Sequence, residues 1–360
     1  MSVKDEMEDI RARIDSIDDE ILKLLQNRSS LSVEMGRLKR QGNRLVFDPS
    51  REEEIIRRMD GKLKPPLTKP IVERIFREIF SGSRSLQLRL KVAYLGPEGS
   101  FSHQAAFSVF SLDGDLTPYK DIEGVIQAVA SGRTDLGVVP VENSTEGMIN
   151  LTLDMMASTR LCVIQELMLP IRNCLLSNIP KEKIRKVFSH PQPLAQCRLW
   201  LSSNLPRAEI IETTSTSDAA MAARSHEDGA AVASSMAAEL YSLSILAENI
   251  NDFRENITRF WVISRVAAPV SSNAKTSIIV TLDNRPGALY NALGAFARKG
   301  INLTKIESRP SKKNAWEYLF FIDFQGNLSD DNVKSTIEEI REFTRDIIIL
   351  GSYPEGRTLP

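Results

Sequence analysis

One predicted helix restricts how this chain can fold more than any other feature of the sequence. Apolar side chains recur at steps of four and three along one face, as a packed helix requires, at Ile10, Ile14, Ile17, Ile21, Leu24, Leu31, Met35 and Leu38. A helix between Asp5 and Arg40 would be roughly 54 Å long at about 1.5 Å per residue. A small domain cannot cover that length. We therefore expect the helix to pair with a second copy of the chain, in a homodimer or a higher even oligomer.

Cations interrupt the apolar face of this helix. Arg28 stands where the next apolar residue is due, Lys39 lies four residues beyond Met35, and Arg11 borders the start of the face. An unpaired charge held in an apolar seam costs on the order of several kcal/mol. These cations therefore require buried carboxylates or an anionic ligand, unless their long side chains reach solvent along a surface helix.

Two further helices carry polar groups at seam positions. Asp48 and Pro49 suit the N-cap and the first position of a second helix, and Arg51 and Glu52 follow in its first turn. After the breaker at residues 61–66, a third helix places Ser83 and Gln87 where apolar residues are expected. The three helices together predict a small cationic pocket with neutral hydrogen-bond donors.

In order and spacing, these polar residues resemble the active-site set of the all-helical chorismate mutases: Arg11, Arg28, Lys39, Asp48, Arg51, Glu52, Ser83 and Gln87. The resemblance implies an intertwined helical dimer in which Arg11 reaches the pocket of the partner chain. Chorismate is a dicarboxylate ether that rearranges without acid, base or covalent intermediate, so catalysis rests on holding one conformer and stabilising charge.

The resemblance also implies roles for most residues of the helical pocket. Arg11 and Arg28 would hold the carboxylates of chorismate. Lys39 and Gln87 would donate to the ether oxygen. The hydroxyl and the remaining polar edge of the substrate would be positioned by Asp48, Glu52 and Ser83.

Residues 91–267 alternate between strand-like and helical segments. Polar tips follow four of the apolar strands, and such tips converge on a cleft when the strands form an open parallel sheet. Each tip alone would also suit ordinary helix N-capping. The tips are residues 96–102, residues 142–144, residues 189–192 and residues 213–216.

A further strand begins with Thr258 and Arg259. The threonine hydroxyl can donate a hydrogen bond, and the guanidinium can grip a carboxylate with two donors. An edge strand with an exposed threonine and arginine would show the same pattern. Together with the polar tips, the pair favours a cleft for an acidic substrate.

This half of the chain resembles prephenate dehydratase through residues 96–101, residues 140–144, residues 189–192 and residues 258–260. The resemblance implies two α/β lobes around a cleft, similar to periplasmic binding proteins. It also implies that prephenate loses CO₂ and water to give phenylpyruvate, a step that needs carboxylate binding and protonation of the departing hydroxyl. Thr258 would be the donor, Arg259 would hold a carboxylate, and Glu142 would supply a proton if burial raised its pKa. The substrate would be bound and oriented by Asn143, Ser144, Ser189 and Gln196.

A linker at residues 267–273 precedes a βαββαβ pattern over residues 275–355. This part resembles the ACT domain, an amino-acid sensor, through residues 284–289 and residues 307–310. Gly287 would let a ligand approach the backbone closely, and Pro286 would start the helix that faces it. The resemblance implies phenylalanine binding by Asn284, Pro286, Gly287, Ala288, Leu289, Glu307, Ser308 and Arg309.

Composition restricts the remaining possibilities. The formal net charge is −1, so no global basic field favours nucleic acid. The chain has neither an apolar leader nor a run of 18 apolar residues, which predicts a cytoplasmic protein that makes no use of a membrane. Three cysteines without Cys-x-x-Cys spacing and three scattered histidines predict neither a metal site nor a disulfide framework. A Gly-x-Gly-x-x-Gly fingerprint is absent, so no dinucleotide cofactor is expected.

The three resemblances together predict a multidomain enzyme that needs no cofactor. An all-α mutase module would span residues 1–90, a two-lobed α/β dehydratase residues 91–267, and an α+β sensor, ferredoxin-like in its βαββαβ order, residues 275–355. Phenylalanine would inhibit it by feedback. A non-catalytic amino-acid-binding protein is the alternative, but it leaves the seam cations unexplained. A fusion of the mutase to prephenate dehydrogenase would require the missing nicotinamide fingerprint.

Overall fold

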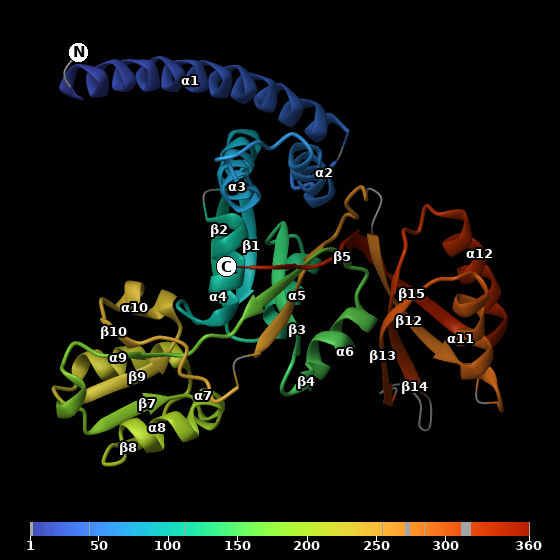
Figure 1. The fold of residues 1–360 in the computed structure, drawn as a ribbon. Coiled ribbons are helices and arrows are strands. Elements are labelled where there is room, and N and C mark those ends of the chain that lie inside the picture. The colour runs from blue at the N-terminus through green and yellow to red at the C-terminus, as the bar shows by residue number, and fades with distance from the viewer. Residues whose placement is uncertain are drawn as a thin grey trace.

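The chain folds into three units arranged in sequence order (Figure 1). A computed structural model describes residues 3–42, 44–111, 113–253, 255–270, 274–283, 285–310 and 318–359. The first unit is helical, the second has two α/β lobes, and the third packs two helices on one sheet. The predicted multidomain fold is confirmed.

The helical unit consists of α1 (Val3–Gln41), α2 (Pro49–Asp60) and α3 (Lys69–Gln87). The long helix predicted between Asp5 and Arg40 forms as α1, and its N-terminal half projects away from the rest of the chain (Figure 1). The Asp48 side chain caps α2 by accepting from the Arg51 backbone N–H at 3.0 Å. In this single chain the apolar face of α1 is uncovered: its side chains are 48% to 67% exposed at Ile10, Ile14, Ile17, Ile21, Leu24, Leu31, Met35 and Leu38.

The first lobe of the second unit is built on a seven-stranded sheet of order β16-β5-β11-β3-β1-β2, with β4 added beside β3. The strands are β1 (Leu90–Leu95), β2 (Gly114–Tyr119), β3 (Leu136–Asn143), β4 (Gly147–Met148), β5 (Cys162–Pro170), β11 (Ile257–Ser264) and β16 (Arg357–Thr358). Its helices are α4 (Phe101–Phe110), α5 (Ile122–Ala130) and α6 (Asn150–Ser158). Strand β1 is parallel to β2 and β3, but β11 is antiparallel to both of its neighbours. The expectation of a parallel sheet is therefore wrong at β11, because the chain enters this strand on its way back from the second lobe.

The second lobe has a five-stranded sheet of order β10-β6-β9-β7-β8. Its strands are β6 (Cys174–Leu176), β7 (Lys186–Ser189), β8 (Glu209–Glu212), β9 (Gly229–Ala233) and β10 (Ile245–Ala247). Its helices are η1 (Lys181–Lys183), α7 (Pro191–Gln196), α8 (Arg198–Asn204), α9 (Thr216–Ser225) and α10 (Ser235–Tyr241). The chain crosses between the lobes twice, from β5 to β6 and from β10 to β11. Both crossings border the space between the lobes.

The third unit has the predicted βαββαβ order. Its elements are β12 (Ala274–Leu282), α11 (Ala288–Arg298), β13 (Leu303–Pro310), β14 (Tyr318–Gln325), α12 (Asp331–Ile340), η2 (Arg341–Phe343) and β15 (Thr344–Pro354). The antiparallel sheet has the order β13-β14-β12-β15. Helices α11 and α12 cover one face, and the other face packs on the first lobe, where Ile279 and Tyr353 share a core cluster with Trp261. The sensor sheet is thereby joined directly to the sheet that contains β11.

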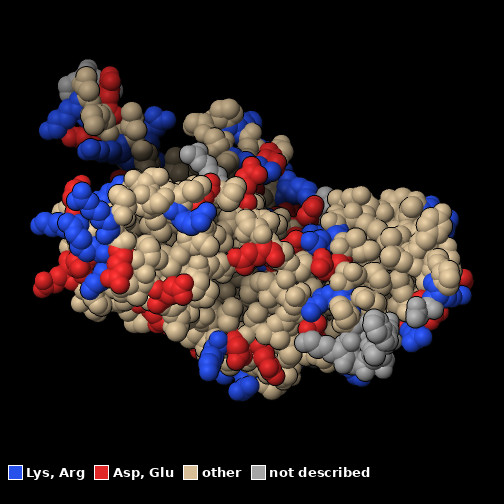
Figure 2. All heavy atoms as spheres, turned by 90° about the horizontal axis from the view of Figure 1, so that it is seen from below, with Lys and Arg blue, Asp and Glu red and all other residues tan. Residues whose placement is uncertain are grey.

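Charges of both signs lie side by side on the face shown in Figure 2, as the net charge of −1 leads one to expect. Across the described ranges, no helix combines the length and apolarity needed to cross a membrane. Cys162, Cys174 and Cys197 are free thiols. The same ranges contain no group of three or more His, Cys, Asp or Glu side chains placed to hold a metal ion.

Candidate active sites

A cavity of about 570 Å³ lies among the three N-terminal helices. From the predicted set it is lined by Arg28, Lys39, Asp48, Arg51, Glu52, Ser83 and Gln87. Arg11 is the exception. It lies on the exposed N-terminal part of α1, about 26 Å along the helix from Arg28 at about 1.5 Å per residue. It therefore cannot reach the cavity of its own chain.

Two cations of this cavity, Arg28 and Lys39, are held in place by neutral acceptors. The Arg28 guanidinium donates to the Ser83 hydroxyl, which itself donates to the Ile79 carbonyl at 2.7 Å. The Lys39 ammonium donates to the Val46 carbonyl at 2.7 Å. Burial lowers the pKa of Lys39 below the ordinary lysine value, and the carboxylates nearby oppose this shift in part. The cavity thus presents two oriented cations to an anionic ligand.

Gly36 brings the last turn of α3 against α1. It is the buried residue of α1, and a Cβ at this position would lie 2.8 Å from both Cβ and Cγ of Gln87. The buried Oε1 of Gln87 has no hydrogen-bond partner among the described residues, so this amide oxygen is free to accept a hydrogen bond. Gly36 is not among the predicted site residues, although a glycine within a predicted helix is a signal for close packing.

Arg84 also lines the helical cavity and was not predicted. Its guanidinium donates to the Glu52 carboxylate. Burial raises the pKa of Glu52, while Arg84 acts in the opposite direction. Glu52 therefore depends on a cation that follows Ser83 directly in the sequence.

A second cavity, of about 340 Å³, lies between the two lobes of the second unit. From the predicted set it is lined by Asn143, Gln196 and Thr258. Phe260 also lines it, and Phe101 and Ser102 bring the first turn of α4 to its wall. The described residues that line it include one acidic residue, Glu146, and neither lysine nor arginine, so an anionic ligand would depend on hydroxyl, amide and helix N-terminal donors.

Amide side chains set the orientation of the Thr258 hydroxyl. The Asn143 side-chain nitrogen donates to Thr258 Oγ1 and to Asn256 Oδ1, both at 2.8 Å. The Asn256 nitrogen in turn donates to Gln196 Oε1 at 3.1 Å, which links the residue before β11 to α7 of the second lobe. Because the Thr258 oxygen is already an acceptor, its own hydrogen remains for an acceptor in the cavity.

Two of the predicted prephenate-binding residues hold the backbone at strand ends. The fully buried Ser189 hydroxyl donates to the Val232 carbonyl at 2.6 Å. The Ser144 hydroxyl donates to the Glu255 carbonyl at 3.0 Å. Neither side chain lines the cavity between the lobes.

Arg259 points away from the cavity, because consecutive residues of a strand face opposite sides of the sheet and Thr258 faces inward. Its buried guanidinium forms ion pairs with Glu166 of β5 and Asp323 of β14. Glu142 also lies on this side, where it pairs with Lys305 of β13. The expectation that Arg259 and Glu142 contact the substrate is corrected by these positions: both residues join the dehydratase-like lobe to the sensor-like unit.

The predicted effector residues gather at one end of the third sheet. Thr281 of β12 pairs with Leu319 of β14, which pairs with Arg309 of β13, so the turn after β12 and the end of β13 are neighbours. Gly287 has a φ of 81° and caps α11, whose first turn contains Ala288 and Leu289. Asn284 lies outside the described residues. Pro286, Glu307 and Ser308 belong to this end, whereas Arg309 forms an ion pair with Asp154 of α6 at 3.4 Å.

Family models match three consecutive parts of the chain. The model described as chorismate mutase type II matches residues 10–88, the model of prephenate dehydratase matches residues 92–268, and the model of the ACT domain matches residues 276–342. The three matches follow one another in the order of the three structural units.

Curated relatives match over almost the whole chain. A bifunctional chorismate mutase/prephenate dehydratase of Aquifex aeolicus (strain VF5) is 43% identical over 357 residues, which is 98% of this chain and 99% of that protein. The protein of the same name from Pseudomonas aeruginosa is 41% identical over 363 residues, 99% of this chain and 100% of its own length. The crystal structure of a prephenate dehydratase from Arthrobacter aurescens in complex with L-Phe is 33% identical, with a TM-score of 0.69 over 74% of this chain and 90% of that one.

Proposed function

Because the chain belongs to the family of bifunctional chorismate mutase/prephenate dehydratases, we propose that each of its two cavities catalyses one of two successive reactions. The helical cavity rearranges chorismate to prephenate. The cavity between the lobes converts prephenate to phenylpyruvate, CO₂ and water. We assign residues 1–90 to the mutase, residues 91–267 to the dehydratase and residues 275–355 to the ACT domain.

The convergence of Arg28, Lys39 and Gln87 on one volume supports the mutase assignment. Arg28 would hold a carboxylate of chorismate, while Lys39 and the side-chain nitrogen of Gln87 would donate to the ether oxygen as its charge grows. Glu52 would accept from the substrate hydroxyl, and Asp48, Arg51 and Ser83 would fix the polar edge. No proton has to be exchanged, since bond breaking and bond making occur within one molecule.

A second copy of the chain would complete the mutase cavity. The apolar face of α1 is exposed along its length, and Arg11 lies too far from its own cavity to contribute there. We place Arg11 in the partner's cavity, where it would hold the second carboxylate. The assembly is then a homodimer or a higher even oligomer.

The orientation of Thr258 supports the dehydratase assignment. Its hydroxyl hydrogen is free for the leaving hydroxyl of prephenate, because Asn143 already donates to its oxygen. As the bond between the ring and the carboxylate carbon breaks, its electron pair enters the ring and the carbon–oxygen bond of the hydroxyl breaks. The hydroxyl, to which Thr258 donates a hydrogen bond, takes up one proton that solvent supplies and departs as water. Ser102 and the first turn of α4 would bind a carboxylate, and Gln192 and Gln196 would contact the substrate from the second lobe.

Phenylalanine would bind at the end of the ACT sheet formed by Gly287, Ala288 and Ser308. Ser308 is exposed on β13, which is an edge strand of that sheet, so a second ACT domain would be able to close over the ligand. The effector would act by preferring one arrangement of the domains. The three free thiols suit a reducing compartment, and we place the enzyme in the cytoplasm.

The test is to incubate purified chain with chorismate and no added cofactor, and to follow prephenate and phenylpyruvate by chromatography. Both products are expected in that order, and phenylalanine should suppress the second. Chorismate that stays unchanged while added prephenate is still dehydrated would overturn the mutase assignment. Prephenate that accumulates without phenylpyruvate would overturn the dehydratase assignment.

A further inference from the structure

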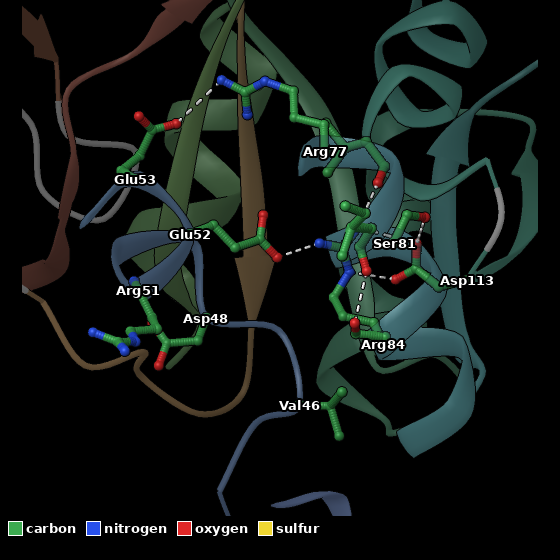
Figure 3. A network of polar contacts seen from close by, with 12 residues as sticks. Val46, Asp48, Arg51, Glu52, Glu53, Arg77, Ser81, Arg84 and Asp113 are labelled. Carbon is green, nitrogen blue, oxygen red and sulfur yellow. Dashed lines mark hydrogen bonds and ion pairs between the residues drawn. The ribbon is translucent and has the colours of Figure 1, made fainter. Parts of the chain in front are cut away.

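Arg84 spans the boundary between the mutase helices and the dehydratase domain (Figure 3). It lies in the last turn of α3, and its side chain is 6% exposed. Asp113, in the loop before β2, grips the guanidinium with two oxygens, at 2.6 Å to Nε and 3.1 Å to Nη2. The same Nη2 donates to the Val109 carbonyl at 2.9 Å. Two of the three guanidinium nitrogens are thus bound by the dehydratase domain.

The third nitrogen, Nη1, donates to Glu52 at the edge of the mutase cavity. The Phe47 ring lies beside the guanidinium, with its centroid 5.2 Å from Cζ. Because the guanidinium is planar and its donors form a fixed fork, holding one side at Asp113 fixes where the other side points. The position of the Glu52 carboxylate is therefore set by a residue of the dehydratase domain.

Asp113 is itself immobilised. It is fully buried, and its Oδ1 accepts from the Ser81 hydroxyl at 2.7 Å. Its backbone carbonyl accepts from the Leu90 N–H at 2.9 Å, where the chain passes from α3 into β1. The array Asp113–Arg84–Glu52 is consequently anchored at its dehydratase end.

From this array we infer that Asp113 and Arg84 are positioning residues of the mutase reaction, which hold the Glu52 carboxylate toward the chorismate hydroxyl. The dehydratase domain thereby completes the mutase site. The inference rests on the mutase activity proposed for the helical cavity. It assigns a mutase role to an aspartate outside the helical module.

Electrostatics supply a readout that a purely structural role would not change. Burial raises the pKa of Glu52 and Arg84 opposes this shift more than any other group does, so removing this cation leaves the burial effect largely unopposed. Glu52 would then hold its proton to higher pH. Other charged groups also act on Glu52: Asp113 raises its pKa and Arg77 lowers it. Further charged residues line the two cavities that Glu52 borders: Arg28, Lys39, Arg44, Asp48, Arg51, Glu78 and Arg357.

The experiment uses the full-length chain and measures both activities separately, with added chorismate and with added prephenate. Asp113→Asn keeps the shape of the side chain but removes its charge, and it should lower mutase kcat/KM by about tenfold or more, the size of effect known for residues that orient metal ligands. Dehydratase kcat/KM should stay within about twofold. Asp115→Asn is the matched control, because this exposed aspartate lies two residues away and should change neither activity.

Two variants of Arg84 test how mutase activity depends on pH. With Arg84→Met, mutase kcat/KM should rise with increasing pH more than that of the wild type does, because Glu52 keeps its proton to higher pH and the ionised carboxylate is the stronger acceptor for the substrate hydroxyl. Arg84→Lys keeps a positive charge but not the forked guanidinium donors. The loss of mutase kcat/KM should therefore be smaller than in Arg84→Met, and the pH profile should be closer to that of the wild type.

The inference is overturned if Asp113→Asn retains wild-type mutase activity, or if it loses both activities together. It is also overturned if Arg84→Met loses activity equally at every pH. A wild-type chain without any mutase activity would instead contradict the proposed function.

Discussion

A guanidinium nitrogen of Arg259 in the dehydratase domain lies 2.7 Å from the Asp323 carboxylate of the ACT domain. Both side chains are buried, and the guanidinium also donates to the Tyr353 hydroxyl at 3.2 Å. Thr258 precedes Arg259 in β11 and faces the dehydratase cavity on the opposite side of the sheet. One strand therefore connects the ACT interface with the hydroxyl that we propose as the donor in dehydration.

Replacing Asp323 should weaken feedback inhibition. Asp323→Asn removes a charge from the contact between β11 and the ACT sheet, while Arg259 keeps its ion pair with Glu166. We expect dehydratase turnover without phenylalanine to stay within about threefold, and the phenylalanine concentration for half-inhibition to rise at least about fivefold. Asp346→Asn, at an exposed position of β15, is the control. Unchanged inhibition in Asp323→Asn would show that this contact does not transmit the effect of phenylalanine to the dehydratase cavity.

The Thr258 hydroxyl should be essential for dehydration. Thr258→Val keeps the shape and the strand preference of the side chain but removes the donor, so dehydratase kcat should fall by about a hundredfold or more. Thr258→Ser keeps a hydroxyl and should stay within about tenfold of the wild type. Mutase activity should be unaffected in both. Equal activity of the Val and Ser variants, measured with added prephenate, would remove the hydroxyl from the mechanism.

Gly36→Ala should separate helix stability from mutase activity. Alanine raises helix propensity by about 1 kcal/mol, but its Cβ would lie 2.8 Å from Gln87 and push that residue from its position. Mutase kcat/KM should fall by about tenfold or more, with dehydratase activity unchanged. Gly82→Ala in α3 meets nothing within 4 Å, and it should leave both activities intact. A fully active Gly36→Ala enzyme would mean that the placement of Gln87 does not matter.

Mutase activity should decline at alkaline pH. Burial lowers the pKa of Lys39, so its ammonium loses the proton at a lower pH than an ordinary lysine does. Because the proposed role of Lys39 requires the charged form, activity is retained below this pKa and lost as pH rises through it. Lys39→Arg stays charged and should have lower activity but no alkaline decline. A wild-type profile that stays flat up to the pKa of free lysine would show that deprotonating Lys39 is harmless.

The periodic parts of the fold were predictable from the sequence. The apolar steps of four and three locate α1, and the position where Arg28 replaces an apolar residue lines the mutase cavity. The Asp48-Pro49 start of α2 and the βαββαβ order of the ACT domain follow from local preferences of the same kind. Local patterns are informative because one helix face or one strand end determines them.

Local patterns could not predict which side of the sheet each residue of a strand faces, or which residues make contact across the boundary between modules. Thr258 and Arg259 are adjacent, so only one of them can face the cavity, and the sheet packing decides which. Arg84 follows Ser83 but lies about 100° further around the helix, and its partner Asp113 belongs to another domain. No periodic pattern links residues 84 and 113.

The central claim, that one chain contains two separate sites acting in sequence, is tested most directly by mixing two variants with chorismate. Arg28→Ala should make no prephenate but dehydrate it when supplied, and Thr258→Val should stop at prephenate. Neither variant alone should form phenylpyruvate from chorismate, whereas a mixture should form it after a lag in which free prephenate accumulates. Phenylpyruvate formed from chorismate at the wild-type rate by Arg28→Ala alone would contradict the account.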